Sequence, residues 1–185
     1  MKKFYIFDMD GTLCDSMEFW RTETAMIDDF RDRKALEPCY DRMREHYRRD
    51  IELKDGVLEF IQNAERQGIR MCIASATRRD VSQPFLDKTG IMEHMEFYID
   101  CYEIRAFKER PDIYLKAAER LGADISECVV FEDAEYCIET ARNAGFYIVG
   151  VYDAVAEREG DPRRLCDRFI ESWSEASDIL LTANK

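Results

Sequence analysis

Two aspartates, Asp8 and Asp10, stand two residues apart where an apolar run ends, and Gly11 follows them. Side chains two residues apart in an extended chain point to the same side, so the two carboxylates would crowd together at the end of a strand. Such crowding is unfavourable unless a cation or a chemical task holds the charges in place. The pair therefore indicates either a charged reaction centre or a turn at a strand end, where aspartate is also common.

Other polar residues also stand at the ends of runs rich in strand-forming residues. They are Ser75, Asp100, Glu132 and Asp133. In an open parallel sheet, ligands gather beyond the carboxyl ends of the strands. Acidic groups from several strand ends can surround one hard cation, and oxygen ligands with room for water and a phosphate suit Mg²⁺. The pattern therefore predicts a Mg²⁺ site at one edge of a sheet.

The elements that would position these groups alternate along the chain. Strand-like runs cover residues 3–7, 70–75, 96–100, 128–133 and 146–151. Helical patterns lie at residues 55–68, 110–122 and 134–145. Each helical pattern ends at a glycine, which is a usual helix stop. Strands that alternate with helices and are apolar nearly throughout are typical of an α/β fold with a parallel sheet covered on both faces.

Residues 15–53 interrupt this alternation because they carry no strand signal. Their apolar residues form two helical stripes, the first made of Phe19, Trp20, Met26, Ile27 and Phe30 and the second of Cys39, Met43, Tyr47 and Ile51. A break is predicted between Leu36 and Pro38. The 185 residues can bury one good-sized core and leave room for a small insertion. We therefore predict a core of residues 1–14 and 54–185 and a small helical cap of residues 15–53.

Charge and cysteine usage limit the possible partners. A net charge of −12 repels phosphate backbones and anionic lipid heads, which argues against nucleic acid or a membrane. An anionic substrate would then need a local cation, and Lys108 is the candidate. The seven cysteines show no paired metal or redox spacing, and no segment resembles a signal peptide or a membrane span. We expect a cytoplasmic protein that is a monomer or a weak homodimer.

Four motifs in order resemble those of the haloacid dehalogenase-like superfamily. "DMDGT" at residues 8–12 resembles its first motif, and Ser75 of "IASAT" stands where that family ends its second strand with Ser or Thr. Lys108 of "FKERPDIY" matches the lysine of the third motif, and Glu132 and Asp133 of "VVFED" match the acidic pair of the fourth. The resemblance covers essentially the whole chain, including a last strand and helix in "DRFIESWSEASDILL", and it is strongest to the phosphoglycolate phosphatase and β-phosphoglucomutase branch. It implies a Rossmann-like core with a reduced helical cap.

The resemblance also implies a role for each motif residue. Asp8 would be the nucleophile that becomes an aspartyl-phosphate, and Asp10 would be the general acid and base. Mg²⁺ would be held by Asp8 and Asp133 through their carboxylates and by Asp10 through its backbone carbonyl, with Glu132 as a further contributor. Ser75, Ala76 and Lys108 would bind the substrate phosphate. Ser75, Thr77 and Asp133 are also suitable helix caps, and these alternatives stay open.

The implied function is Mg²⁺-dependent hydrolysis of a small-molecule phosphate monoester. Asp10 favours phosphate chemistry over dehalogenation, because displacing a halide needs no proton donor there. A phosphomutase of the β-phosphoglucomutase type would use the same two aspartates but must exclude water, which a short cap does poorly. A non-catalytic phosphate-binding regulatory module is the other alternative.

Overall fold

The computed structural model describes residues 2–27, 33–177 and 179 of the chain. The strands of the described part form one parallel sheet in the order β3-β2-β1-β4-β5-β6. Their bounds are β1 Phe4–Phe7, β2 Arg70–Ser75, β3 Tyr98–Asp100, β4 Cys128–Glu132, β5 Tyr147–Val151 and β6 Arg168–Ile170. The predicted α/β fold with a parallel sheet is therefore confirmed, and the predicted strands agree with these bounds to within two residues.

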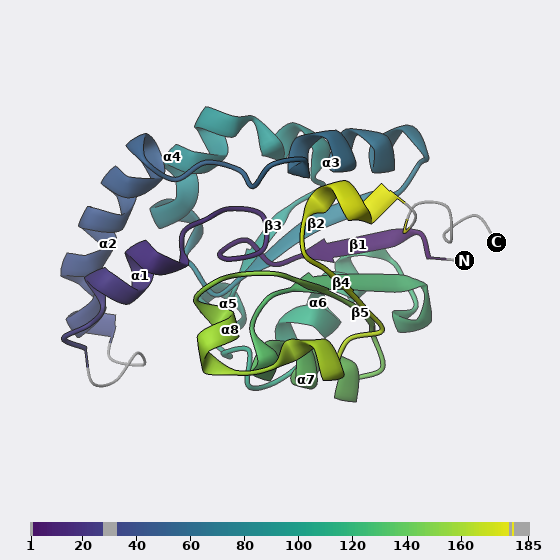
Figure 1. Cartoon of the computed structure of the whole chain (residues 1–185). Helices are drawn as coiled ribbons and strands as arrows, with labels where there is room; N and C mark the ends of the chain where they lie inside the picture. The colour runs from purple at the N-terminus through teal and green to yellow at the C-terminus, as the bar shows by residue number, and fades with distance from the viewer. Residues whose placement is uncertain (1, 28–32, 178, 180–185) are drawn as a thin grey trace.

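Helices cover both faces of the sheet, as the apolar pattern predicts. Helices α3 (Val57–Arg66) and α4 (Arg79–Thr89) lie on one face, and α6 (Asp112–Leu121) and α7 (Glu135–Asn143) lie on the other (Figure 1). Tyr5 and Phe7 of β1 belong to the buried cluster of the first face, and Ile6 belongs to that of the second. Alternate side chains of a buried strand thus serve two cores, which fixes β1 in the centre of the molecule.

Short helices complete the described part of the chain. They are α5 (Cys101–Ile104), α8 (Ala156–Glu159) and the 3₁₀ turns η1 (Ile91–His94), η2 (Ile125–Glu127), η3 (Pro162–Arg164) and η4 (Trp173–Ala176). Strand β6 and turn η4 lie in the segment that resembles the last strand and helix of the superfamily. Residue 178 and residues 180–185 lie outside the described residues, so a longer final helix remains a prediction.

Helices α1 (Met17–Glu23) and α2 (Arg33–Arg49) follow β1 and lie beyond the carboxyl ends of the strands, at the left of Figure 1. The break predicted near Pro38 is wrong, because α2 runs through this proline. Pro38 is the sixth residue of the helix, so its missing N–H costs one bond close to the helix start. Met26 is 92% exposed and does not belong to an apolar stripe, and Phe30 lies outside the described residues.

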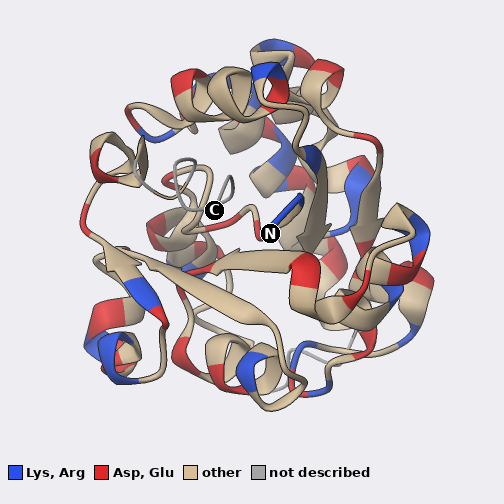
Figure 2. Cartoon of the chain, turned by 90° about the vertical axis from the view of Figure 1, so that its right-hand side faces the viewer, with Lys and Arg blue, Asp and Glu red and all other residues tan. Residues whose placement is uncertain are grey.

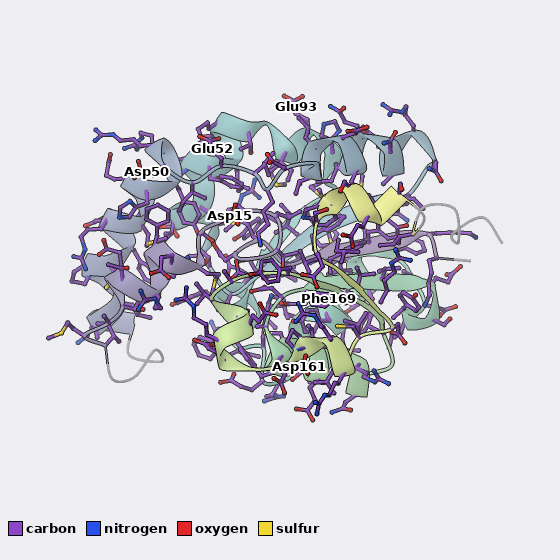
Figure 3. The ribbon with its side chains drawn as sticks, in the orientation of Figure 1. Asp15, Asp50, Glu52, Glu93, Asp161 and Phe169 are labelled. Atoms are coloured by element: carbon purple, nitrogen blue, oxygen red, sulfur yellow. The ribbon has the colours of Figure 1, made fainter. Side chains whose placement is uncertain are left out.

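The chain leaves and re-enters the sheet region at neighbouring points. Cys14 and Leu53 form an antiparallel bridge, and the Lys54 N–H donates to the Leu13 carbonyl at 2.9 Å. The Lys54 ammonium donates to the Tyr152 carbonyl at 2.7 Å and lies 3.5 Å from Asp15, the residue labelled in the connection between β1 and α1 (Figure 3). Residues 15–53 are therefore joined to the sheet region by two adjacent segments.

Charged residues of both signs are interspersed over the outer helices and loops at the end where the termini lie, whereas the strands carry few (Figure 2). The net charge of −12 is thus not gathered into one block on that side. Among the described helices, none combines the length and the apolar character that crossing a membrane requires.

Candidate active site

Three carboxylates meet at the carboxyl ends of β1 and β4. These strands are neighbours, with Phe7 beside Phe131, so Asp8 follows the end of β1 while Glu132 ends β4 and Asp133 follows it. One carboxylate oxygen from each residue lies within 4.8 Å of the other two, and all three residues are buried. Because the chain changes its direction of travel across the sheet between β1 and β4, this is the place where ligands collect in an open parallel sheet.

Lys108, from the loop before α6, lies inside this acidic cluster. Its ammonium contacts Asp8 Oδ1 and donates to Glu132 Oε1 at 2.5 Å, and the residue is only 3% exposed. The Tyr114 hydroxyl of α6 donates to the same Glu132 oxygen at 2.6 Å. Glu132 is therefore held from two sides, and it fixes the lysine beside Asp8.

Burial shapes the protonation of these groups. Burial, strengthened by the Glu132 charge, raises the pKa of the Asp8 carboxyl to about 8, although Lys108 opposes the shift. Burial and the charge of Asp8 likewise raise the pKa of Asp133 well above its ordinary value. Three buried acids with a single ammonium among them leave negative charge that a further cation would neutralise.

Asp133 has one oxygen with an assigned partner and one without. The Thr12 hydroxyl donates to Asp133 Oδ1 at 3.0 Å, whereas Oδ2 is buried with no hydrogen-bond partner in the described part of the chain. Gly11, at φ +85°, passes so close that a Cβ there would lie 2.3 Å from this Oδ2. The free oxygen, the all-oxygen donor set and the excess negative charge fit a hard divalent cation such as Mg²⁺.

Asp10 is surrounded by neutral donors instead of charges. Its Oδ1 accepts hydrogen bonds from the Ser16 hydroxyl at 2.6 Å, the Trp20 indole at 3.3 Å and the Tyr47 hydroxyl. Its Oδ2 accepts from the Thr77 hydroxyl at 2.7 Å and the Ser75 hydroxyl at 3.5 Å. One oxygen thus faces residues 16–47, and the other faces the loop after β2.

The capping alternatives raised by the sequence are not observed. The N-cap of α4 is Arg78 and that of α7 is Ala134, and neither helix has a side-chain cap. Ser75 instead accepts from the Thr77 N–H at 3.0 Å. Asp100 does not belong to the acidic cluster. Its carboxylate caps α5, where it accepts hydrogen bonds from two backbone N–H groups at 2.9 Å.

Besides Ser16, whose hydroxyl donates to Asp10, sequence reasoning missed three larger groups that touch the candidate residues. The sequence places Trp20 and Tyr47 only on the two apolar stripes of residues 15–53, and it gives Tyr114 no role. Each lies on an apolar helical stripe, where a buried hydroxyl or indole has no sequence signal that distinguishes it from a packing residue. Their polar ends become visible only through the partners that they meet.

A cavity of about 800 Å³ reaches the carboxylates. Asp8, Asp10, Lys108 and Ala76 line it at one end, and helices α1 and α2 contribute to its walls. Cavities of this size suit a small molecule. The site therefore combines a buried acidic cluster, a buried lysine and an open volume next to them.

Comparison with known proteins defines the class of protein. The family model described as "haloacid dehalogenase-like hydrolase" matches residues 20–145, and the chain belongs to this family. The structure of CbbY from Rhodobacter sphaeroides in complex with phosphate has the same fold, with a TM-score of 0.81 and 21% identity over 96% of this chain and 97% of that one.

Two similar curated proteins carry names that describe an activity. Validoxylamine A 7'-phosphate phosphatase of Streptomyces hygroscopicus subsp. limoneus is 24% identical, covering 87% of this chain and 92% of that protein. Beta-phosphoglucomutase of Bacillus subtilis is 26% identical, covering 97% of this chain and 93% of that protein. The chain thus spans nearly the full length of both relatives.

Proposed function

We propose that this chain is a Mg²⁺-dependent phosphatase that hydrolyses a small-molecule phosphate monoester through an aspartyl-phosphate on Asp8. One observation carries the proposal: Asp8 is buried against Lys108 at the end of the cavity, in a cluster where Asp133 keeps a buried oxygen without a partner. A relative named as a phosphatase supports the same reaction.

The carboxylates of Asp8, Glu132 and Asp133, with the backbone carbonyl of Asp10, would hold the Mg²⁺. When bound, the ion would offset the charge of these carboxylates and of the phosphate, so that an anion can approach Asp8. Lys108 would add a second positive charge beside the nucleophile, and Ser75 and Ala76 would bind phosphoryl oxygens.

The proposed reaction has two displacements at phosphorus. In the first, an Asp8 carboxylate oxygen bonds to phosphorus while the bond to the alcohol oxygen breaks, and protonated Asp10 gives its proton to that oxygen. In the second, Asp10 takes a proton from water as the water oxygen bonds to phosphorus. The Asp8–phosphorus bond breaks, and inorganic phosphate and free Asp8 result.

We further propose that residues 15–53 act as a small cap on a core of residues 1–14 and 54–185. The adjacent entry and exit at Cys14 and Leu53 support this division. So do the donors that residues 16–47 aim at Asp10, since they tie the helical segment to the reacting end of the cavity. A cap in this place would cover part of the cavity, and because it is short it would leave water access to the phosphoryl group.

We propose a cytoplasmic location, since all seven cysteines are free thiols. We also propose a monomer or a weak homodimer that acts on small molecules rather than on nucleic acid or membranes.

A phosphomutase is a second candidate because of the similarity to Beta-phosphoglucomutase. Isomerisation of a sugar phosphate without net release of phosphate would favour the mutase.

The test is phosphate release from a panel of phosphate esters with Mg²⁺ and with a chelator, using the wild type, Asp8→Asn and Asp10→Ala. We expect release that requires the metal and is nearly lost in both variants. Metal binding is followed separately by thermal unfolding, where Mg²⁺ should raise the melting temperature of the wild type and do so less for Asp133→Asn. Release that persists in the chelator, or an Asp8→Asn protein as active as the wild type, would contradict the proposal.

A further inference from the structure

The cavity above the acidic cluster has walls that are more apolar than polar and that include five aromatic rings. The rings that line it are Trp20, Tyr40, Tyr102, Phe107 and Tyr136, contributed by α1, α2, α5, α7 and the loop before α6. At about 800 Å³ the cavity is larger than a phosphoryl group needs. The rest of that volume is available to the alcohol part of a substrate.

Several polar atoms of these walls are already used within the protein. The Trp20 indole donates to Asp10 and to the Tyr47 hydroxyl, and the Tyr40 and Tyr102 hydroxyls bond to each other. The Thr24 hydroxyl, also in the wall, donates to a backbone carbonyl at 2.6 Å. Most of these donors are already in use, so a polyhydroxylated leaving group would compete with hydrogen bonds inside the protein, which is unfavourable.

The described walls also offer poor binding for a second anionic group. Outside the acidic cluster, Asp10 and Lys108, the charged residues among the described lining are Arg21, Glu109 and Glu159. The Arg21 guanidinium is paired with Glu18 at 3.0 Å, and its side chain is 54% exposed. A second phosphate or a carboxylate would meet two acids and one arginine that is already paired.

From this cavity we infer the substrate class: a phosphate monoester whose alcohol is uncharged and carries a flat, largely apolar group such as an aryl ring. This inference rests on the proposed phosphatase activity. The aryl group removes apolar surface from water and packs on the rings of the wall, while the single phosphate lies at the Asp8 end. Bisphosphates, phosphorylated acids and sugar phosphates are poorer substrates because their polar groups must compete with hydrogen bonds and ion pairs that the walls already make.

The test compares esters whose alcohols differ in shape but leave equally well. Benzyl phosphate and fructose 1-phosphate are both esters of primary alcohols, and acetyl phosphate reports on the phosphate end alone. With Mg²⁺ present, we expect kcat/KM for benzyl phosphate to exceed that for fructose 1-phosphate at least about tenfold, through a lower KM. Equal values, or a preference for fructose 1-phosphate, would overturn the inference.

Variants of two wall residues test whether the cavity wall causes the preference for benzyl phosphate. Phe107→Ala and Tyr136→Ala should each raise the KM for benzyl phosphate several-fold and leave acetyl phosphate hydrolysis within about twofold. Phe169→Ala is the matched control, because this aromatic residue of β6 is labelled well away from α1 and α2 in Figure 3 and does not line the cavity. This variant should change neither the KM for benzyl phosphate nor the hydrolysis of acetyl phosphate.

The two proposals fail in different ways. Suppose that acetyl phosphate hydrolysis needs Mg²⁺ and Asp8 but benzyl phosphate is not preferred over fructose 1-phosphate. This result would overturn the proposed substrate class and would still support the proposed phosphatase activity. If Phe107→Ala slowed both substrates equally, the wall would have no role in selecting the alcohol. No hydrolysis of any ester would overturn both proposals.

Discussion

Asp8 and Asp10 are the same residue type two positions apart, yet they lie in opposite surroundings. Asp8 is 5% exposed and pairs with the Lys108 ammonium among two further carboxylates. Asp10 is partly buried and accepts five hydrogen bonds from hydroxyl and indole donors. Charge holds the first aspartate in place, and neutral dipoles hold the second.

The difference shows how one short motif can supply two functions. The partners of Asp8 come from residues 108–133, all in the sheet region. The partners of Asp10 come from residues 16–47 on one oxygen and residues 75–77 on the other. Surroundings rather than residue type therefore separate a proposed nucleophile from a proposed acid and base. Asp10 is also the point where the helical segment meets the sheet region.

The largest effect is expected when the charge balance around Asp8 is broken. Lys108→Met removes the ammonium between Asp8 and Glu132, so activity should fall roughly 100-fold or more. Stability should also fall, by about 3 kcal/mol, because buried carboxylates lose their partner. Phosphate release and urea unfolding measure the two effects.

Lys116→Met is the matched control, since that ammonium pairs with Glu119 at 2.8 Å on the surface. Its stability should stay within about 0.5 kcal/mol of the wild type. A Lys108→Met protein that keeps more than a tenth of the activity would show that Asp8 does not depend on this charge.

A smaller effect is expected from crowding Asp133, a residue of the proposed metal site. Gly11→Ala places a methyl group against Asp133 Oδ2 and also puts alanine at a positive φ. Displacing this oxygen should lower activity by about tenfold or more and reduce the melting-temperature gain from Mg²⁺.

Gly68→Ala separates backbone strain from crowding, because Gly68 has φ +76° but open space around its Cβ position. It should cost about 1 kcal/mol in stability and nothing in activity. Equal loss of activity in both variants would mean that strain alone explains Gly11.

On the Asp10 side, Tyr47→Phe removes one donor to Oδ1. If Tyr47 positions the general acid, hydrolysis of alkyl phosphates should slow about tenfold, because their leaving oxygen needs a proton. Hydrolysis of 4-nitrophenyl phosphate, whose phenolate leaves without one, should change less than about twofold. Steady-state rates on both esters give the ratio.

Tyr5→Phe is the control for that change. Both tyrosines are fully buried, but the Tyr5 hydroxyl has no hydrogen-bond partner among the described residues. It should leave the ratio between the two esters unaltered. A Tyr47→Phe protein that slows on both esters to the same extent would assign Tyr47 a purely structural role.

The smallest effect concerns the link between α1 and α2. His46 contacts Asp50 at 2.8 Å and Glu23 at 3.2 Å. Burial lowers the pKa of His46, but the hydrogen bonds to Asp50 and Glu23 outweigh this, so the pKa is raised above 6.5. A raised histidine pKa contributes stability that is complete below the unfolded value and is lost as the pH rises through the folded value.

His46→Gln should therefore lower the free energy of unfolding by up to about 1 kcal/mol at acidic pH and by much less at alkaline pH. Urea unfolding of both proteins at pH 5.5 and pH 9 measures the difference. The same loss at both values would show that the charge of His46 does not link the two helices.

Much of the framework could be predicted because it depends on short-range pattern. The uninterrupted apolar run of β1 predicts a strand buried on both faces, and the structure places Tyr5 and Ile6 in the two opposite clusters. Strand ends then predict where Asp8 and Asp133 lie, because parallel strands present their carboxyl ends at one edge. The break near Pro38 was mispredicted because the hydrogen bond lost at this proline is outweighed by the packing of α2 against α4.

By itself, the sequence determined the alternation of strands and helices, the edge at which the acidic residues collect, and the four motifs of the family. Only the tertiary structure decided that Lys108 lies between Asp8 and Glu132 and that Tyr47 reaches Asp10. The physical reason is range: strand and helix patterns are set by neighbouring residues, whereas these contacts join residues 100 and 37 positions apart in the chain. Such contacts exist only after the sheet has formed and α2 has packed against α4.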